Sequence, residues 1–516
     1  LEEHDIITRC ARIRNMGKGT VYVNAAHSAC ISFPTDQMDM ISFYGSWGHE
    51  RCPERTPVRH GKITVDSVRG ISSHYQNPST VLCAPGATED SGDCWGIALV
   101  YSGNFAITVE VNDFKQTRLV AGVNPETLYW ELETGGVFET PEAVMTYSAL
   151  GLTGMSHNFH RAVKYHLIPK QFIDQRCPVL INNWEATYFD FTGEKILDIA
   201  RQAKELGVEM MVLDDGWFGK RDSDCSGLGD WQVNVKKLGG SLGSLVSRIN
   251  GLGMKFGIWM EPEMVSEDSS LYREHPDWAF AVPGRKPVRG RSQLVLDFSR
   301  KEVADYIFDS ICRVLDSAHI EYLKWDMNRS IADVYSAAGK MAGGDSPGSI
   351  LYRYMLGLYD FLERLTKRYP DLLIEGCSGG GGRFDAGMLY YTPQIWCSDN
   401  TDALDRLQIQ YGTSFGFPIS AVGSHVSAVP NHQTGRKTPL STRGAVAMAG
   451  RFGYELDLGN VTEEEKEEIR QQIKEYKQLA PLIQTGLYYR LSNPVTDEVA
   501  AWEFVSEDGT QAMMQA

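Results

Sequence analysis

From about residue 175 onward, short apolar runs alternate with longer amphipathic stretches, and this alternation limits the possible folds more than any other feature of the chain. The apolar runs have the length of buried strands, whereas the stretches between them repeat apolar residues every three or four positions, as helices do. Parallel strands joined by crossover helices build α/β folds, and eight such units close a (β/α)8 TIM barrel. We predict the barrel strands at VLINNW (179–184), EMMVLD (209–214), KFGIWME (255–261), IEYLKWD (320–326), LLIEGC (372–377), PQIWC (393–397), FPISAV (417–422) and FGYELDL (452–458).

The stretches between several of these strands have a clear helical period. The predicted helices lie at 196–206, 303–317, 352–369 and 463–483. A ninth strand-like run, QLVLDFS (293–299), exceeds what the barrel needs, and we assign it to a hairpin with WAFAV (278–282) in the long loop after the third strand. A doubly wound open sheet is the alternative fold for the same alternation.

The two ends of the chain have a different pattern. Residues 1 to about 150 consist of short alternating runs separated by Gly, Asn and Pro, which predicts a β-sandwich. Strand patterns return after 485. We therefore predict three domains: an N-terminal β-sandwich over 1–165 that is incomplete at its start, a catalytic barrel over 175–485, and the beginning of a C-terminal β-domain over 486–516.

Charge and cysteine content exclude several classes of protein. A net charge of −16 without a basic stripe argues against nucleic-acid partners, because phosphate would be repelled. No run of eighteen apolar residues predicts a membrane span, and the first ten residues do not resemble a signal peptide. Ten cysteines without a CxxC pair predict free thiols in a reducing compartment, so we expect a cytoplasmic protein.

Residues whose side chains can take part in binding or catalysis follow the predicted strands, at the edge of a barrel where active sites form. Acids, aromatic rings and basic groups together are typical of carbohydrate sites, in which carboxylates bind hydroxyls and rings pack on sugar faces. They are Trp184 after the first strand, Asp214 and Asp215 after the second, Trp259, Glu261 and Glu263 after the third, Lys324, Asp326, Asn328 and Arg329 after the fourth, Glu375, Cys377 and Arg383 after the fifth, and Asp399 and Asp402 after the sixth.

Two of these acids suit the cleavage of a glycosidic bond with retention, which needs one ionised and one protonated carboxyl group. Lys324 lies two residues before Asp326 on one strand, so both side chains point to the same face and the ammonium favours the ionised nucleophile. Trp396 and Cys397 limit the solvation of Asp399, which favours the protonated acid/base. A retaining pair is expected to lie about 5–5.5 Å apart, and an inverting pair about 6.5–9.5 Å apart.

Structural interpretations of the same residues remain open. Asp214 and Asp215 can be a helix cap and a turn residue. Lys324 can pair with Asp326 for stability alone, and a tryptophan at a barrel rim, such as Trp184 or Trp259, can belong to the core.

Two further patterns have competing interpretations. Glycines 379–382 can form a flexible turn or a phosphate cradle, although GGGGR lacks the Lys-Ser/Thr of a P-loop. His425, His432 and Asp457 can suggest a metal site, but no HxH or HExxH spacing supports one, so we predict no metal and no cofactor.

Six runs of the barrel region resemble the signature blocks of the α-galactosidases of glycoside hydrolase family 36, and residues 72–105 resemble the β-supersandwich domain of that family. The resemblance covers essentially the whole chain in order. The six runs are LDDGWFGKRD, KFGIWMEPEMV, RSQLVLDFSR, YLKWDMNR, EGCSGGGGRFD and WCSDNTDALDRL.

The resemblance implies a role for each matched residue. It makes Asp326 the nucleophile and Asp399 the acid/base, and it places Asp214 and Asp215 on the C4 and C6 hydroxyls of galactose. It implies further pocket positions at Trp184, Trp259, Arg291, Lys324, Asn328, Cys377 and Gly380. It also implies a homo-oligomer, possibly a tetramer, in which the N-terminal loops of one subunit approach the active site of another.

The resulting hypothesis is a retaining exo-α-galactosidase that acts on melibiose- and raffinose-type oligosaccharides by double displacement. The alternatives on the same fold are a galactosyltransferase of the raffinose-synthase type and an α-N-acetylgalactosaminidase. A non-catalytic sugar-binding barrel and a metal-dependent barrel hydrolase are more distant alternatives.

Overall fold

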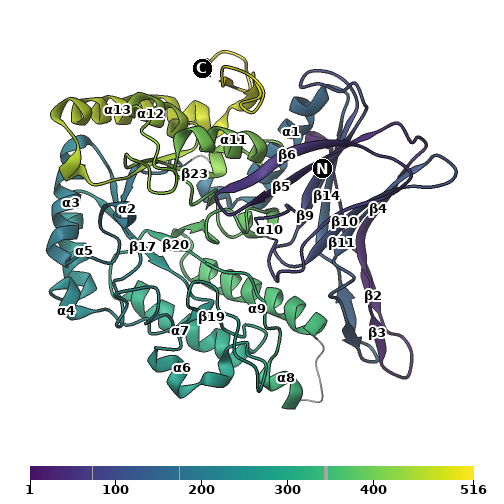
Figure 1. Cartoon of the computed structure of the whole chain (residues 1–516), viewed down its shortest axis with the longest axis horizontal. Coiled ribbons are helices and arrows are strands. Elements are labelled where there is room, and N and C mark those ends of the chain that lie inside the picture. The colour runs from purple at the N-terminus through teal and green to yellow at the C-terminus, as the bar shows by residue number, and fades with distance from the viewer. Residues whose placement is uncertain (73, 174, 342–346) are drawn as a thin grey trace.

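A closed barrel of eight parallel strands forms the centre of the molecule (Figure 1), which we describe from a computed structural model covering residues 1–72, 74–173, 175–341 and 347–516. The predicted TIM barrel is therefore confirmed. Apart from Lys255 at the start of the third strand, every residue of the barrel strands is buried, because helices cover the outside and side chains fill the interior. The strands are β15 (Leu180–Asn182), β16 (Met210–Leu213), β17 (Lys255–Met260), β20 (Tyr322–Trp325), β21 (Leu373–Gly376), β22 (Gln394–Trp396), β23 (Val422–Ser427) and β24 (Arg451–Glu455).

The seventh barrel strand begins later than predicted. Residues 417–422 were expected to form it, but 419–421 form a 3-10 turn and β23 continues to Ser427. The polar residues of VGSHVS conceal this strand, because they are buried and form hydrogen bonds although they are not apolar. The Ser424 hydroxyl donates to Gln410 at 3.0 Å, and His425 Nδ1 lies 3.0 Å from Glu455 Oε2.

The ninth strand-like run lies in the loop after the third barrel strand, as predicted, but its partner differs. β19 (Leu294–Val295) pairs antiparallel with β18 (Met264–Val265). The expected partner segment, 278–282, joins it through a single bridge between Ala279 and Leu296. One short ladder and one isolated bridge thus hold the segment that follows β17.

The predicted helices are present, and local signals mark their ends. The longest, α13 (Glu463–Thr485), begins with a capping box between Thr462 and Glu465. The outer helices include α3 (Gly193–Leu206), α5 (Leu242–Gly251), α7 (Lys301–Asp316), α9 (Pro347–Arg368), α11 (Ala403–Thr413) and α12 (Leu440–Met448). Shorter helices are α2 (Trp184–Thr187), α4 (Val235–Leu238), α6 (Ser270–Glu274), α8 (Ala337–Met341) and α10 (Ala386–Leu389).

The N-terminal region is a β-domain beside the barrel (Figure 1). Its larger sheet has the order β1-β14-β9-β8-β5-β6, and a second sheet has the order β10-β11-β4. Two ribbons, β2–β13 and β3–β12, extend away from these sheets (Figure 1). The strands are β1 (Ile6–Arg9), β2 (Arg12–Arg14), β3 (Val21–Val23), β4 (His27–Phe33), β5 (Asp39–Ser46), β6 (His49–Pro57), β7 (Gly61–Asp66), β8 (Ser79–Cys83), β9 (Cys94–Val100), β10 (Phe105–Val111), β11 (Thr117–Val123), β12 (Trp130–Leu132), β13 (Val137–Glu139) and β14 (Glu142–Ser148).

Helix α1 (Gly151–Ala162) leads from this β-domain towards the barrel, and a three-stranded sheet of β25 (Leu487–Arg490), β26 (Trp502–Val505) and β27 (Ala512–Gln515) follows α13. The domain boundaries at 165–175 and 485–486 remain predictions. Within the described residues, no helix combines the length and the apolar character needed to cross a membrane.

A buried ion pair joins two barrel loops below the rim. Arg383 donates to both carboxylate oxygens of Glu263, at 2.7 and 3.1 Å, and both side chains are almost fully buried. The Glu263 carboxylate also accepts hydrogen bonds from the Trp325 indole at 2.9 Å and from the Tyr354 hydroxyl. These contacts satisfy an acid that would otherwise be costly to bury.

Removing one partner of this pair is expected to destabilise the fold. Arg383→Met would leave the Glu263 charge buried and uncompensated, so we expect a loss of about 3–5 kcal/mol, measured as a lowered unfolding midpoint. The double variant Glu263→Gln with Arg383→Met is the matched control and should lose less. Equal midpoints for Arg383→Met and the unaltered protein would contradict the prediction.

Candidate active site

A cavity of about 270 Å³ opens at the carboxyl ends of the barrel strands. The size fits one sugar ring with several waters. Its walls combine acids, tryptophans and basic groups. The lining residues are Trp47, His74, Trp184, Glu185, Asp214, Asp215, Trp259, Arg291, Lys324, Asp326, Asn328, Gly379, Trp396, Asp399, Thr401, Gln433 and Glu455.

Nine of the eleven residues predicted for the site line this cavity, and the other two, Cys377 and Gly380, lie behind its wall. The Cys377 thiol is 3% exposed and hydrogen-bonds to Asp326. Gly380 has φ +80°, and a Cβ there would stand 2.5 Å from the backbone nitrogen of Asp399. Both residues therefore support the two acids.

Asp326, directly after β20, is held as a carboxylate. Its Oδ1 accepts the backbone N–H groups of Met327 at 2.8 Å and Gly379 at 3.2 Å. Its Oδ2 accepts the Trp259 indole at 3.1 Å and the Asn328 amide at 2.7 Å. Burial raises the pKa of Asp326, but the charge of Lys324 and hydrogen bonds that include Cys377 outweigh it, so the pKa lies below its usual range.

The pKa of Asp399, which lies three residues after β22, is shifted in the opposite direction. Burial raises the pKa of Asp399, and the negative charge of Asp326 raises it further. The Trp47 indole N–H donates to Asp399 Oδ2 at 3.0 Å and acts in the other direction, as do the charges of Lys324 and Arg291. The cavity thus holds one carboxyl group that loses its proton readily and one that retains it.

Asp214 and Asp215 follow β16 and are each 2% exposed. Lys324 Nζ donates to Asp214 Oδ2 at 2.9 Å, so the direct ion-pair partner of this lysine is Asp214 rather than Asp326. Arg221 binds Asp215 through Nε and Nη2, the latter at 2.8 Å. No helix begins at these acids, because α4 starts later and is capped by Asn234, so the interpretation as a helix cap is wrong.

Aromatic rings and one arginine complete the wall. Trp259 is buried but turns its N–H towards Asp326, so it belongs to the cavity as well as to the core. Trp184 is the first residue of α2, and its side chain is partly exposed. Arg291 has φ +50°, and its side chain contacts Asp224 at 3.2 Å. Burial lowers the pKa of Arg291, but the charges of Asp224 and of nearby acids that include Asp326 and Asp399 outweigh it and raise the pKa.

Several lining residues were not predicted, and some had a usable signal. Glu185 follows Trp184 at the end of the first strand, and Glu455 ends the eighth, so the strand-end argument would have found both. Burial and the charge of Glu455 raise the pKa of Glu185 to about 8. Trp47 and His74 belong to the N-terminal β-domain, and no pattern of the barrel sequence points to them.

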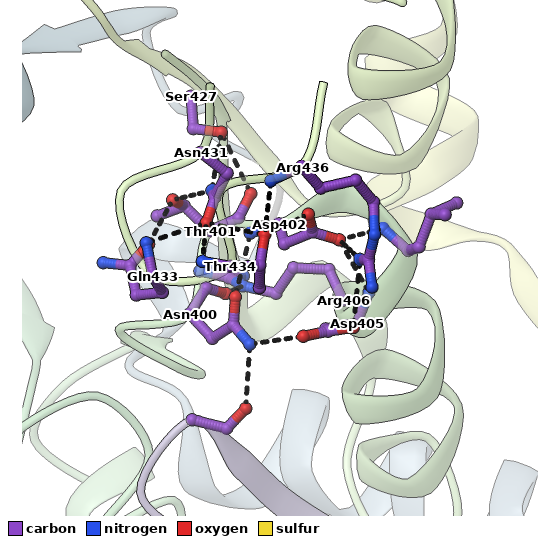
Figure 2. A network of polar contacts seen from close by, with 12 residues as sticks. Asn400, Thr401, Asp402, Asp405, Arg406, Ser427, Asn431, Gln433, Thr434 and Arg436 are labelled. Carbon is purple, nitrogen blue, oxygen red and sulfur yellow. Dashed lines mark hydrogen bonds and ion pairs between the residues drawn. The ribbon is translucent and has the colours of Figure 1, made fainter. Parts of the chain in front are cut away.

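The loop after β23 forms part of the mouth through a network of polar contacts (Figure 2). Asn431 donates to the Thr401 hydroxyl at 2.9 Å, and Thr434 donates to Asp402 at 2.8 Å. Arg436 forms an ion pair with the same Asp402. The Thr401 hydroxyl lies 3.2 Å from Gln433 Oε1, which places this glutamine at the cavity.

The residues considered for a metal site do not meet. His425 pairs with Glu455, and His432 contacts the Tyr188 hydroxyl. Asp457 caps the 3-10 turn that follows β24. In the described part of the chain, the grouping of potential ligands that does occur is Glu3, His4 and His166, which is distant in sequence from the cavity residues and mostly exposed.

A (β/α)8 barrel whose strand ends gather two buried carboxyl groups of opposite pKa shift, with tryptophans around them, defines the class of barrel glycoside hydrolases. Family models agree with this class: the melibiase model matches residues 137–486, and the model of the glycosyl hydrolase family 36 N-terminal domain matches residues 1–133. The chain belongs to glycoside hydrolase family 36.

Characterised relatives have the same architecture. The chain is 56% identical over 514 residues to the bifunctional α-galactosidase/sucrose kinase AgaSK of Mediterraneibacter gnavus, covering 100% of this chain and 54% of that protein. It is 52% identical to the α-galactosidase AgaA of Geobacillus stearothermophilus, covering 99% of this chain and 70% of AgaA. The galactosidase domain of AgaSK superposes with a TM-score of 0.97, covering 100% of this chain and 70% of that one. An AgaA variant in complex with raffinose superposes with a TM-score of 0.96, covering 99% and 71%.

Proposed function

We propose that the chain is a retaining exo-α-galactosidase that removes terminal α-D-galactosyl residues from oligosaccharides such as melibiose and raffinose. The observation that carries this proposal is the presence of Asp326 and Asp399 in one sugar-sized cavity, with the first favoured as an anion and the second as an acid. The names of AgaSK and AgaA, and the raffinose complex of AgaA, support the choice of an α-galactoside.

The chemistry follows from those two protonation states. In the first step the Asp326 carboxylate attacks the anomeric carbon, while Asp399 gives its proton to the departing glycosidic oxygen. In the second step the Asp399 carboxylate takes a proton from water, which attacks the galactosyl-enzyme. Activity should fall at low pH as Asp326 becomes protonated, and at high pH as Asp399 loses its proton.

The acids after β16 supply the preference for galactose. Asp214 and Asp215 are buried, and cations on the protein side hold them in place. A site built to bind the axial 4-hydroxyl would leave these carboxylates without that partner when the epimer glucose enters, which is unfavourable.

An assay of substrate preference tests the proposed function. The chain should release galactose from melibiose and raffinose and should prefer aryl α-galactoside over aryl α-glucoside by about 10⁴-fold in kcat/KM. Asp214→Asn should reduce this preference by at least about tenfold, because the site loses the charge aimed at the 4-hydroxyl.

Asp222→Asn is the matched control, since Asp222 follows the same strand but pairs with Lys237 at the surface. It should retain the preference. Binding of galactose without release from any α-galactoside would contradict the proposal. Transfer of galactose to added sugars in place of hydrolysis would favour a galactosyltransferase, and a preference for N-acetylgalactosaminides would favour the corresponding glycosidase.

The proposal extends to assembly and location. The ribbons of β2 and β3 project from the N-terminal domain and expose Met16, Val21 and Tyr22, a surface that suits a homo-oligomer, and we propose a tetramer (Figure 1). All ten cysteines lie in the described part of the chain and are free thiols, which supports a reducing, cytoplasmic location.

A further inference from the structure

The hairpin of β5 and β6 brings a side chain of the N-terminal domain onto the predicted acid/base. Both strands run from the β-domain towards the barrel (Figure 1), and Trp47 lies in the turn between them. Its indole nitrogen is 3.0 Å from Asp399 Oδ2, while 55% of the side chain remains exposed. This hydrogen bond joins the N-terminal domain directly to Asp399.

The hairpin is anchored on both sides of this contact, so the position of Trp47 is well defined. The Asn400 side chain donates to the carbonyl of Gly48 at 3.1 Å. Arg51 is 3% exposed and has φ +56°, an unusual backbone conformation for arginine. Its guanidinium donates to the carbonyls of Gly381 at 3.2 Å and Cys397 at 2.6 Å. These carbonyls belong to the rim loops that carry Asp399 and its neighbouring glycines.

An indole N–H only donates hydrogen bonds, and this restricts where the proton of Asp399 resides. Oδ2 must be the acceptor, and the carbonyl oxygen of a neutral carboxyl group is a stronger acceptor than its hydroxyl oxygen. The proton is therefore favoured on Oδ1. Once Asp399 is ionised, the same N–H stabilises the carboxylate, because hydrogen bonds to charged acceptors are the stronger ones.

We infer that Trp47 is a positioning residue for the acid/base: its N–H keeps the transferable proton on Oδ1 of Asp399 and stabilises the carboxylate that remains after transfer. The inference rests on the proposed function, and it gives the N-terminal domain a part in the chemistry. In the first step the Oδ1–H bond breaks and its electron pair stays on Asp399. The proton joins the glycosidic oxygen as the bond from that oxygen to the anomeric carbon breaks, and Asp326 forms the new bond to this carbon.

Other titratable groups face Asp399, and each would remain in a Trp47 variant. They are the Asp326 carboxylate and the Lys324 ammonium from β20 and its end, the Arg291 guanidinium from the loop after β17, and the Cys377 thiol after β21. A change in titration on altering Trp47 would therefore report the indole N–H itself.

The test compares two replacements of Trp47. Trp47→Phe removes the N–H and part of the ring, whereas incorporation of 3-benzothienylalanine replaces the N–H by sulfur and retains the ring shape. In both variants the basic limb of the kcat/KM profile should move up by about one pH unit. Loss of the N–H hydrogen bond destabilises the Asp399 carboxylate more than the neutral acid, so the pKa of Asp399 rises. At neutral pH, kcat/KM should fall about tenfold for melibiose and much less for a nitrophenyl α-galactoside, whose leaving group needs little protonation.

Tyr44→Phe on the same hairpin is the matched control and should leave the limb unmoved, because Tyr44 is not in the cavity. If the unaltered chain cleaves melibiose but neither Trp47 replacement moves the basic limb, the inference is wrong and the proposed function stands. The same holds if both substrates lose activity equally. If the unaltered chain cleaves no α-galactoside, the proposed function fails first.

Discussion

Asp326→Ala is expected to lower kcat on aryl α-galactosides by about 10⁴-fold or more, because the variant lacks the carboxylate that we propose attacks the anomeric carbon. The remaining binding groups would still hold the sugar, so affinity for galactose should change far less than turnover. Steady-state assays and galactose titrations measure the two effects separately. The methyl group also leaves a small space beside the Trp259 and Asn328 donors that normally bind this carboxylate.

A small external nucleophile distinguishes this role from a structural one. With azide, Asp326→Ala should form β-galactosyl azide from an activated substrate, since azide enters on the face left by the carboxylate. Asp371→Ala, an exposed change in the loop after α9, should behave as the unaltered protein. Full turnover by Asp326→Ala would defeat the assignment of the nucleophile.

Asp399→Ala is expected to produce a loss that depends on the leaving group. Turnover of melibiose and raffinose should fall by about 10²–10⁴-fold, because a sugar alkoxide leaves poorly without a proton. Aryl galactosides with acidic phenols should form the galactosyl-enzyme nearly normally and then accumulate it, since water lacks its general base. A burst of phenol followed by slow release is the measurement.

Azide again provides the decisive product. It needs no general base, so Asp399→Ala should release α-galactosyl azide, with the configuration of the substrate retained. A β-configured product from this variant would indicate an inverting pair and would overturn the proposed double displacement. Equal losses for sugar and aryl substrates would show that Asp399 does not supply the proton.

Much of the barrel could be predicted because burial on both faces leaves a strong trace in sequence. The parallel strands appear in the sequence as continuous apolar runs. The residues that follow them meet at one rim of the barrel, independently of the length and conformation of the loops. Asp326 was accessible to this argument because Lys324 lies two residues earlier on the same strand. The seventh strand was misplaced because His425 and Ser424 are polar yet buried, each with a hydrogen-bonding partner.

Contacts between segments far apart in sequence could not be predicted from strand periodicity and strand ends. The charge of Lys324 lowers the pKa of Asp326, in line with the prediction, but the ion-pair partner of this lysine is Asp214, more than a hundred residues away. Cys377 and Gly380 were expected in the wall and lie behind it. Trp47 was not anticipated at all, since nothing in a β-hairpin of the first fifty residues indicates a contact with Asp399.

By itself, the sequence determined most of the barrel strands, the edge of the barrel at which the active site forms, and most of the acids at that edge, because periodicity and strand ends are local properties of the chain. Only the tertiary structure decided which groups shift the pKa of each acid and which hairpin reaches Asp399. Burial, neighbouring charge and hydrogen bonds set a pKa, and these depend on which segments, far apart in sequence, come to lie around the carboxyl group.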